Sequence, residues 1–256
     1  KYEDYQVDQS IYVVGNEQDY HFQVLALILK KLGKPYADGI YHLSYGMVDL
    51  PSGKMKSREG TVVDADELMD EMKATAKQYA DASEKLALLP EGEREQLYQH
   101  IGLAALKYFI LKAEPKKRMR FDPEASIDFQ GDTGPFLQYT HARIRSVATK
   151  AADYYDLDQL SLTPANELNE SERTVLKMLY KFGPKVAEAE RDMAPSTIAH
   201  YAHDLARTYN KFYQDYPILG NDPETTQQFR VALSITVADI LARAMQLLGI
   251  HPPERM

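Results

Sequence analysis

The sequence predicts an α/β segment followed by a mainly helical segment. Residues 11–48 contain a β-prone run, an amphipathic run and a second β-prone run, which is the order of a parallel strand–helix–strand crossover. Beyond residue 66, almost every stretch has apolar residues three or four positions apart, the spacing of amphipathic helices. The 256 residues suffice for one large or two modest domains.

The first predicted elements are a strand and a helix. Residues 11–14 form a short β-prone run that ends at Gly15, and we interpret it as a buried strand. Residues 19–32 are predicted to be a helix that stops at Gly33. The apolar face of this helix consists of Phe22, Leu25, Ile28, Leu29 and Leu32.

A second strand is predicted at residues 40–48. Two strands are too few for a stable doubly wound sheet, so we expect the remaining strands to lie before Lys1 or in another chain. Residues 1–75 are therefore interpreted as half of a nucleotide-binding domain. A polar stretch follows at residues 51–60, whose glycines and basic residues predict an exposed loop.

The remainder of the chain is predicted to be helical. Asp64 or Asp66 can cap the first of these helices. The helices are expected at residues 66–88, 91–113, 134–155, 169–191, 196–213 and 224–249. A connector at residues 114–133, with short extended pieces such as residues 126–129, and a polar loop at residues 156–168 separate them.

Composition excludes several classes of function. The chain has no cysteine, which excludes disulfides, thiolate metal sites and a cysteine nucleophile, and which fits a cytosolic protein. No apolar run approaches the roughly 18 residues of a membrane span, and residues 1–10 do not resemble a signal peptide. The formal net charge of −8 argues against a general nucleic-acid coat protein, but not against RNA binding through a local basic and aromatic patch. The sequence shows no cluster of metal ligands.

The loop at residues 52–61 carries the most informative chemistry. Its flanking glycines let it move, and Lys54, Lys56 and Arg58 can meet the negative charge that spreads over a triphosphate. The glycine-rich pattern of P-loop proteins is absent. Taken alone, this stretch has the alternative interpretation of a solvated basic loop.

The helix after the connector has two distinct faces. Asp132 or Thr133 is predicted to cap it. Its packing stripe consists of Leu137, Thr140, Ile144, Val147 and Ala151. Phe136, Tyr139 and Arg143 share a different face, where two aromatic rings and a cation can stack on unpaired bases and meet phosphate. The alternative is a second packing face in a helix bundle.

A later helix shows the same division into faces. Leu205, Tyr209 and Phe212 form a core stripe. Asn210 and Tyr213 share another face, which fits the same RNA-binding module.

Three stretches resemble the arginyl-tRNA synthetases, a family of class I aminoacyl-tRNA synthetases. The stretch GMVDLPSGKMKSREGT at residues 46–61 resembles the family's Lys-Met-Ser-Lys-Ser region, with Ser57 where the second lysine would stand. YVVGNEQDYHF at residues 12–22 resembles the strand-to-helix turn that holds ATP. GDTGPFLQYTHARIRS at residues 131–146 resembles the start of the anticodon-binding helical domain. The three matches occur in the family's order and cover essentially the whole chain.

The resemblance implies two groups of ATP contacts. The mobile loop that closes over ATP, when arginine is joined to AMP, contains the candidate catalytic residues Lys54, Lys56, Ser57 and Arg58. The residues implied near the ATP ribose are Gly15, Glu17, Gln18 and His21. Main-chain groups of Met47 or Val48 are implied near adenine, and Mg²⁺ would accompany ATP, held mainly by phosphates and water. Apart from the resemblance, His21 is equally a helix-surface histidine.

The same resemblance implies a tRNA-binding surface. Its candidate residues are Phe136, Tyr139, Arg143, Asn210, Tyr213 and Met256. Phe136 stands where the family frequently has tyrosine, which removes a hydroxyl and keeps the stacking surface. The alternative for Met256 is a frayed chain end.

The implied fold is a partial Rossmann-like class I catalytic half-domain at residues 1–75, a helical connector at 76–130 and an all-helical anticodon-binding bundle at 131–256. The implied partners are ATP, arginine and tRNA(Arg), in a cytoplasmic arginine–tRNA ligase that is monomeric at full length. The half with the His-Ile-Gly-His signature is missing from this C-terminal piece. We therefore expect the piece alone to form no arginyl-adenylate.

Three alternatives remain open at the level of the sequence. The chain can be a stand-alone RNA-binding module with a degenerate nucleotide fold, or a helical interaction scaffold. It can also belong to another class I synthetase, such as the cysteine enzyme, although Gly131-Asp132-Thr133-Gly134-Pro135 is associated with the arginine branch.

Overall fold

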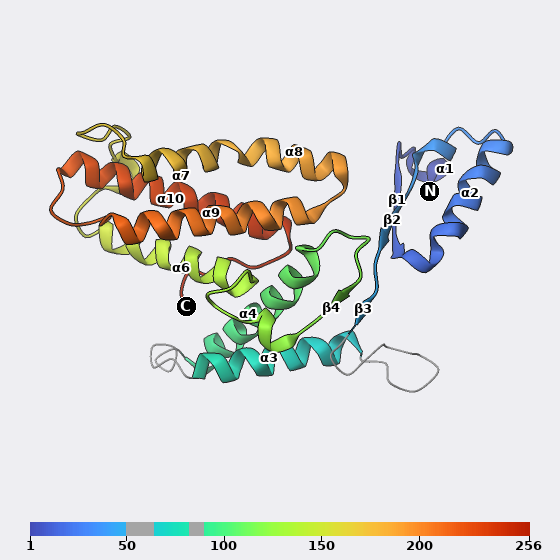
Figure 1. Cartoon of the computed structure of the whole chain (residues 1–256), viewed down its shortest axis with the longest axis horizontal. Coiled ribbons are helices and arrows are strands. Elements are labelled where there is room, and N and C mark those ends of the chain that lie inside the picture. The colour runs from blue at the N-terminus through green and yellow to red at the C-terminus, as the bar shows by residue number, and fades with distance from the viewer. Residues whose placement is uncertain (50–63, 82–89) are drawn as a thin grey trace.

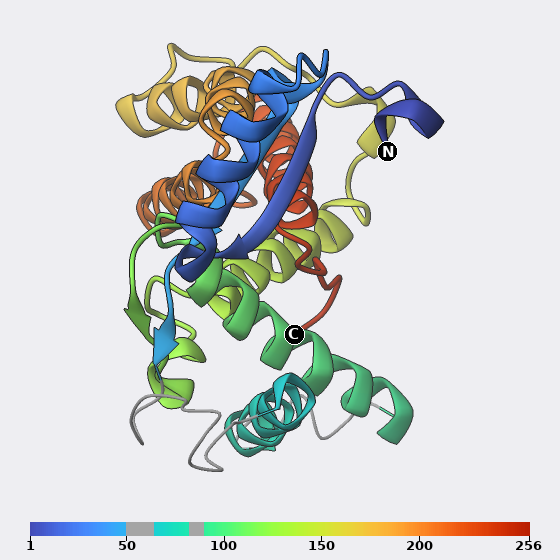
Figure 2. The ribbon, with the colours of Figure 1, turned by 90° about the vertical axis from the view of Figure 1, so that its right-hand side faces the viewer.

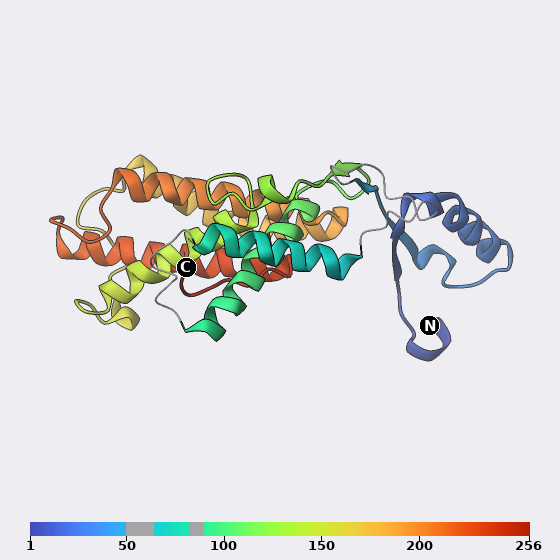
Figure 3. The same ribbon diagram turned by 90° about the horizontal axis from the view of Figure 1, so that it is seen from below.

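The computed structural model describes residues 1–49, 64–81 and 90–256. A strand–helix–strand segment lies beyond one end of a larger helical part, as Figures 1 and 3 show from two directions. Figure 2 looks at that end of the molecule, with the strand–helix–strand segment in front of the helices. The predicted order of an α/β segment followed by helices is confirmed.

The first segment is a parallel crossover. After a short helix α1 (Tyr2–Tyr5), strand β1 (Ser10–Gly15) leads through α2 (Asp19–Lys31) to β2 (Ile40–Tyr45). The two strands pair in parallel, from Ser10 opposite Ile40 to Gly15 opposite Tyr45, which confirms the predicted topology.

The prediction that the first strand is buried is wrong for this chain. Tyr12 faces α2 and packs against Phe22, with 5.2 Å between the ring centroids. Ile11 and Val13 point to the other face and are 44% and 65% exposed. The reason is that alternate residues of a strand face opposite sides of the sheet, and α2 covers only one side. The predicted apolar face of α2 is likewise only partly covered, and Leu32 is 64% exposed.

The second predicted strand bends at Gly46. It divides into β2 and a two-residue strand β3 (Val48–Asp49), which pairs with β4 (Met119–Arg120). A Cβ on Gly46 would lie 2.4 Å from the carbonyl oxygen of Lys117, so only glycine permits this close approach. The amide of Gly46 donates to the carbonyl of Pro115 over 2.7 Å.

Two long helices link this sheet to the bundle. Helices α3 (Ala65–Asp81) and α4 (Glu91–Leu111) pack against each other and cross obliquely, as Figure 1 shows. Asp64 caps α3, since its Oδ1 accepts from the amide of Asp66 over 2.9 Å. The shared core of this part consists of Met72, Ala76, Leu97, Tyr98, Ile101, Ala105, Leu106, Phe121 and Ile127.

The prediction of an extended piece at residues 126–129 is wrong. A short helix α5 (Pro123–Ser126) ends at the first residue of that stretch, and residues 127–129 belong to no strand. Asp122 causes this local structure, because its carboxylate accepts from the amide of Ala125 and Pro123 suits the first helical position.

The remaining helices form a bundle around one apolar core. They are α6 (Gly134–Ala151), α7 (Glu170–Tyr180), α8 (Phe182–Asp192), α9 (Pro195–Asp215) and α10 (Glu224–Leu247). The predicted single helix at 169–191 is in fact the two helices α7 and α8, which meet at Lys181. Pro184 explains the break, because proline has no amide hydrogen to continue the helical ladder.

Both predicted packing stripes are confirmed. On α6, the five stripe residues from Leu137 to Ala151 are buried, and on α9 Leu205, Tyr209 and Phe212 have no exposed surface. The burial of these stripes fixes the rotation of both helices, so their other faces are turned toward a shared groove.

Candidate RNA-binding groove and nucleotide-binding turn

A groove of about 1450 Å³ lies between α6 and α9. The loop after α9 forms one wall, and residues of α3, α4 and the end of the chain close another. All six residues predicted to bind tRNA line it: Phe136, Tyr139, Arg143, Asn210, Tyr213 and Met256. The structure therefore brings together side chains that are up to 120 positions apart in the sequence.

Arg143 stands at the centre of this groove. Its Cζ lies 4.7 Å from the ring centroid of Tyr139 and 5.5 Å from that of Tyr213. Its Nη1 donates to Oδ1 of Asn210 over 2.8 Å. The amide nitrogen of Asn210 in turn donates to Oγ1 of the buried Thr140 over 2.9 Å. Two rings and one amide thus hold the guanidinium in a defined position.

The groove has a positive lining in an acidic protein. Arg143 and Lys150 are its cations, and no aspartate or glutamate is among the described residues that line it. The whole chain has a formal net charge of −8. This local excess of positive charge favours an anionic ligand.

Several lining residues were not predicted. Phe129 contacts Tyr139 edge to face, with 6.5 Å between the ring centroids, and Tyr79 reaches the groove from α3. The sequence has no signal for either, because one lies in the irregular connector and the other on a separate helix. Lys150 had a signal, since it follows Arg143 by seven positions and so lies on the same helix face.

A polar cluster around Asp132 lies at the N-terminus of α6. Thr133 is the cap of α6, with Oγ1 accepting from the amide of Phe136 over 3.3 Å. Asp132 instead accepts from the Tyr108 hydroxyl at 2.6 Å and from Lys112 Nζ at 3.2 Å. Burial raises the pKa of Asp132, but the Tyr108 hydrogen bond and the Lys112 charge outweigh it and keep that pKa below its ordinary value. Burial, followed by the bond to Asp132, raises the pKa of Tyr108 far above its usual range.

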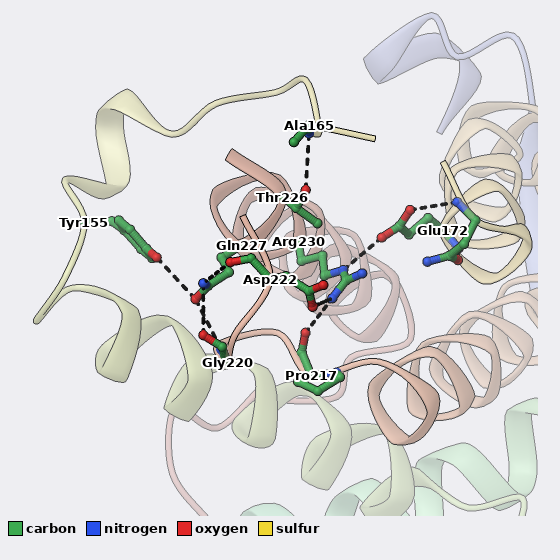
Figure 4. A network of polar contacts seen from close by, with 10 residues as sticks. Tyr155, Ala165, Glu172, Pro217, Gly220, Asp222, Thr226, Gln227 and Arg230 are labelled. Carbon is green, nitrogen blue, oxygen red and sulfur yellow. Dashed lines mark hydrogen bonds and ion pairs between the residues drawn. The ribbon is translucent and has the colours of Figure 1, made fainter. Parts of the chain in front are cut away.

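Arg230 holds the loop that forms one wall of the groove, as Figure 4 shows. Its guanidinium donates to Glu172 at 2.9 Å, to Asp222 at 2.7 Å and to the carbonyl of Pro217 at 2.9 Å. Gln227 adds bonds to Gly220 and to the carbonyl of Asp222. Since Pro217 lines the groove, this network fixes the shape of the wall.

The predicted nucleotide-binding turn lies where β1 ends. Gly15 leads into a short 3₁₀ helix (Asn16–Gln18), in which Glu17 and Gln18 are exposed, and His21 is exposed in the first turn of α2. His21 Nδ1 and Gln18 Oε1 are 2.6 Å apart. A side-chain atom on Gly15 would meet only the ring of Tyr45, at 3.9 Å, so a ligand has access to this backbone.

Met47 and Val48, which are predicted to lie near adenine, lie where β2 gives way to β3. The carbonyl of Met47 accepts from the amide of Met119 over 3.1 Å, which commits it to the β3–β4 pair. Neighbouring residues of a strand direct their main-chain groups to opposite sides, so those of Val48 point away from β4.

His42 was not predicted as an individual site residue. Its Nε2 lies 3.0 Å from the carbonyl oxygen of Val14, its Nδ1 lies 3.2 Å from Asp19, and its ring stacks on Phe22 at 4.2 Å. His42 therefore joins β2 to both β1 and α2, through residues on either side of the turn at residues 15–18.

Lys54, Lys56, Ser57 and Arg58 lie outside the described residues. In the described ranges, no three histidine, cysteine, aspartate or glutamate side chains form a group that could hold a metal ion. None of the helices in the same ranges is long and apolar enough to cross a membrane.

Two family models match consecutive parts of the chain. The model for the catalytic domain of the class I (R) tRNA synthetases matches residues 1–122. The model for the DALR anticodon binding domain matches residues 137–256, the part that contains the α6–α9 groove.

Individual relatives agree with these models. The arginine–tRNA ligase of Bacteroides thetaiotaomicron is 50% identical over all of this chain, and that of Flavobacterium psychrophilum is 52% identical over 96% of it. The chain spans 43% and 40% of their respective lengths. The structure of Thermus thermophilus arginyl-tRNA synthetase superposes on 98% of this chain and 42% of its own, with a TM-score of 0.86 and 29% identity. The chain therefore belongs to the arginyl-tRNA synthetase family of class I synthetases, and the fold class expected from the resemblance is confirmed.

Proposed function

We propose that this chain is part of an arginine–tRNA ligase and supplies its anticodon recognition and its mobile ATP loop. The full enzyme would activate arginine with ATP and transfer it to tRNA(Arg). The observation that carries the proposal is the α6–α9 groove, in which aromatic rings, cations and an amide meet without any acidic lining residue in the described part of the chain. Membership of the family supports the same function.

The groove suits an RNA loop better than a double helix. Unpaired bases stack on aromatic rings, and Tyr139 and Tyr213 are 40% and 36% exposed and therefore available. Arg143 and Lys150 can meet phosphate groups, and the amide of Asn210 can bond to the edge of a base. We propose Phe136, Tyr139, Arg143, Asn210, Tyr213 and Met256 as the tRNA contacts, with Phe129, Tyr79 and Lys150 added from the structure.

The nucleotide-binding turn is proposed to receive the ribose of ATP. Gly15 leaves the backbone accessible, and Glu17, Gln18 and His21 offer polar groups beside it. Of the two residues proposed near adenine, the main-chain groups of Val48 are the better choice, because Met47 uses its carbonyl within the β3–β4 pair.

The remaining assignments follow from the family and stay proposals. They place Lys54, Lys56, Ser57 and Arg58 on the phosphates, Mg²⁺ with ATP, and most of the arginine pocket in the half of the enzyme outside this chain. They also divide the chain at residues 75 and 130 and describe a cytoplasmic enzyme that is monomeric at full length.

The proposal is tested by tRNA(Arg) binding to the intact protein and its Tyr139→Ala and Tyr213→Ala variants. Loss of one stacked base costs about 1–3 kcal/mol, so each variant is expected to raise the Kd by about fivefold to about 100-fold. Tyr180→Ala is the matched control, because Tyr180 is 85% exposed on α7 and does not line the groove. If both groove variants bind within about twofold of the control, the groove is not the tRNA site.

A further inference from the structure

The segment that follows α10 folds back across the molecule instead of leaving it. Gly249, with a φ of 66°, ends the helix in a left-handed conformation. The amides of Gly249 and Ile250 donate to the carbonyls of Gln246 and Met245, which is the double bond of a Schellman motif. The segment Gly249–Met256, called the strap below, then runs toward α4 and α6 (Figure 1).

Two buried side chains of α6 hold the main chain of the strap. Nε2 of Gln138 donates to the carbonyl of His251 over 2.8 Å, and Nδ1 of His141 bonds to the carbonyl of Pro253 over 2.9 Å. Gln138 has no exposed surface and His141 is 3% exposed. The two donors are three positions apart and so lie on the same face of α6, and the carbonyls that they meet are two positions apart on the strap.

Further contacts hold the strap along its length. Lys107 Nζ bonds to the carbonyl of Gly249, the rings of His100 and His251 lie 4.0 Å apart, and Arg145 forms an ion pair with Glu254 at 2.7 Å. These contacts are exposed or half-exposed, so solvent competes with them. The bonds from the two buried side chains of α6 are therefore the better protected polar contacts of the strap, and they act together with the burial of Ile250 and Pro253.

The strap places Met256 where the core of α3 and α4 meets the RNA-binding groove. Met256 packs against the cluster formed by α3 and α4, and it also lines the RNA-binding groove. A side chain in this place can contact an RNA loop only while the strap stays docked. If the strap came free, its residues would have to be ordered again upon binding, which lowers affinity.

We infer that Gln138 and His141 are positioning residues for RNA binding, which act through the strap and through Met256. Neither side chain lines the groove. Their buried donors are directed at the carbonyls that fix the strap, so they pre-organise one edge of the groove before the RNA arrives. This inference rests on the proposed function of the groove.

A double-mutant cycle tests the inference in the intact protein. His141→Ala and Met256→Ala are each expected to raise the Kd for tRNA(Arg) by about fivefold to tenfold. The double variant is expected to bind as Met256→Ala does, because the histidine has nothing left to position. His141→Asn is expected to bind within about twofold of the parent, since its amide nitrogen takes the place of Nδ1. Additive effects of the two substitutions, or an unchanged Kd for His141→Ala, would overturn the inference.

A spectroscopic measurement keeps the test valid if His141→Ala is unstable. The ε-methyl resonance of Met256, assigned from the spectrum of Met256→Ala, is expected at a shifted position in the parent and in His141→Asn. In Gln138→Leu and His141→Ala it is expected to move to the position of a free methionine, and an unmoved resonance in both variants contradicts the inference. The groove variants distinguish failure of the proposed function from failure of the positioning role. Unchanged tRNA binding in both Tyr139→Ala and Tyr213→Ala refutes the proposed function, whereas weakened binding in Tyr213→Ala with normal binding in His141→Ala refutes the positioning role alone.

Discussion

Replacement of Arg230 by methionine is expected to destabilise the bundle strongly. The guanidinium is 7% exposed and reaches three groups that belong to three different parts of the chain (Figure 4). Glu172 lies in the first turn of α7, Pro217 follows α9 and Asp222 precedes α10. Methionine retains the length and apolar stem of arginine, so the substitution tests the charged group and leaves most of the packing intact.

The magnitude follows from the burial of the partners. The carboxylate of Glu172 is 3% exposed and also accepts from the amide of Asn169 over 3.0 Å, so loss of Arg230 leaves a buried charge that keeps one hydrogen bond but has no cation beside it. Breaking such a pair costs about 3–5 kcal/mol. The carboxylate of Asp222 is 40% exposed and can be solvated, so it contributes little. We therefore expect Arg230→Met to lower the free energy of unfolding by about 3–5 kcal/mol.

Urea unfolding followed by circular dichroism measures this loss. The matched control is Arg243→Met on the same helix, because Arg243 is exposed, and we expect it to change the stability by less than about 0.5 kcal/mol. Adding Glu172→Gln to Arg230→Met is expected to recover part of the loss, since it neutralises the stranded carboxylate. A loss for Arg230→Met no larger than that for Arg243→Met would refute the assignment of a stabilising role to this network.

Three further predictions concern pH, packing and charge. Burial lowers the pKa of His141 below 6.5, so the unfolded chain takes up its proton first and stability is lost as the pH falls below about 6.5. His141→Asn is expected to flatten the pH dependence of the unfolding free energy below about pH 6.5 by at most about 1.4 kcal/mol per pH unit, and an unchanged slope would contradict this. Gly134→Ala is expected to cost about 1–3 kcal/mol in urea unfolding, because its Cβ would lie 2.2 Å from the carbonyl oxygen of Ala104. Gly183→Ala, which meets nothing within 4 Å, is expected to stabilise by up to about 1 kcal/mol, and equal effects of the two would argue against the close approach at Gly134. Lys150→Met is expected to reduce the slope of log K for tRNA binding against log salt by about 1, whereas Lys177→Met on α7 leaves it unchanged, and equal slopes would remove Lys150 from the phosphate contacts.

Helical periodicity accounts for what the sequence predicted of the groove. The buried stripes of α6 and α9 were readable from apolar spacing, and they determine which faces remain for a ligand. Phe136, Tyr139 and Arg143 therefore emerged together, as did Asn210 and Tyr213. Whether these two faces lie opposite each other depends on how α6 and α9 pack, and local sequence patterns do not predict that packing.

The features that escaped prediction depend on contacts between distant segments. Gly46 marks a bend only because the backbone of Lys117 passes beside it. Gln138 and His141 belong to neither predicted face of α6, and their role becomes visible only when the strap lies over them. The break between α7 and α8 is different, because Pro184 was readable in the sequence.

Photo-cross-linking tests most directly whether the groove holds the anticodon loop of tRNA(Arg). The photoreactive analogue p-benzoylphenylalanine is placed at Tyr139 in the groove or, as a control, at the exposed Tyr180 on α7. The cross-linked nucleotides are then identified by mass spectrometry. Cross-links from position 139 are expected in the anticodon loop, with none from position 180. Cross-links from position 139 to the acceptor stem, or equal yields from both positions, would contradict anticodon recognition by this groove.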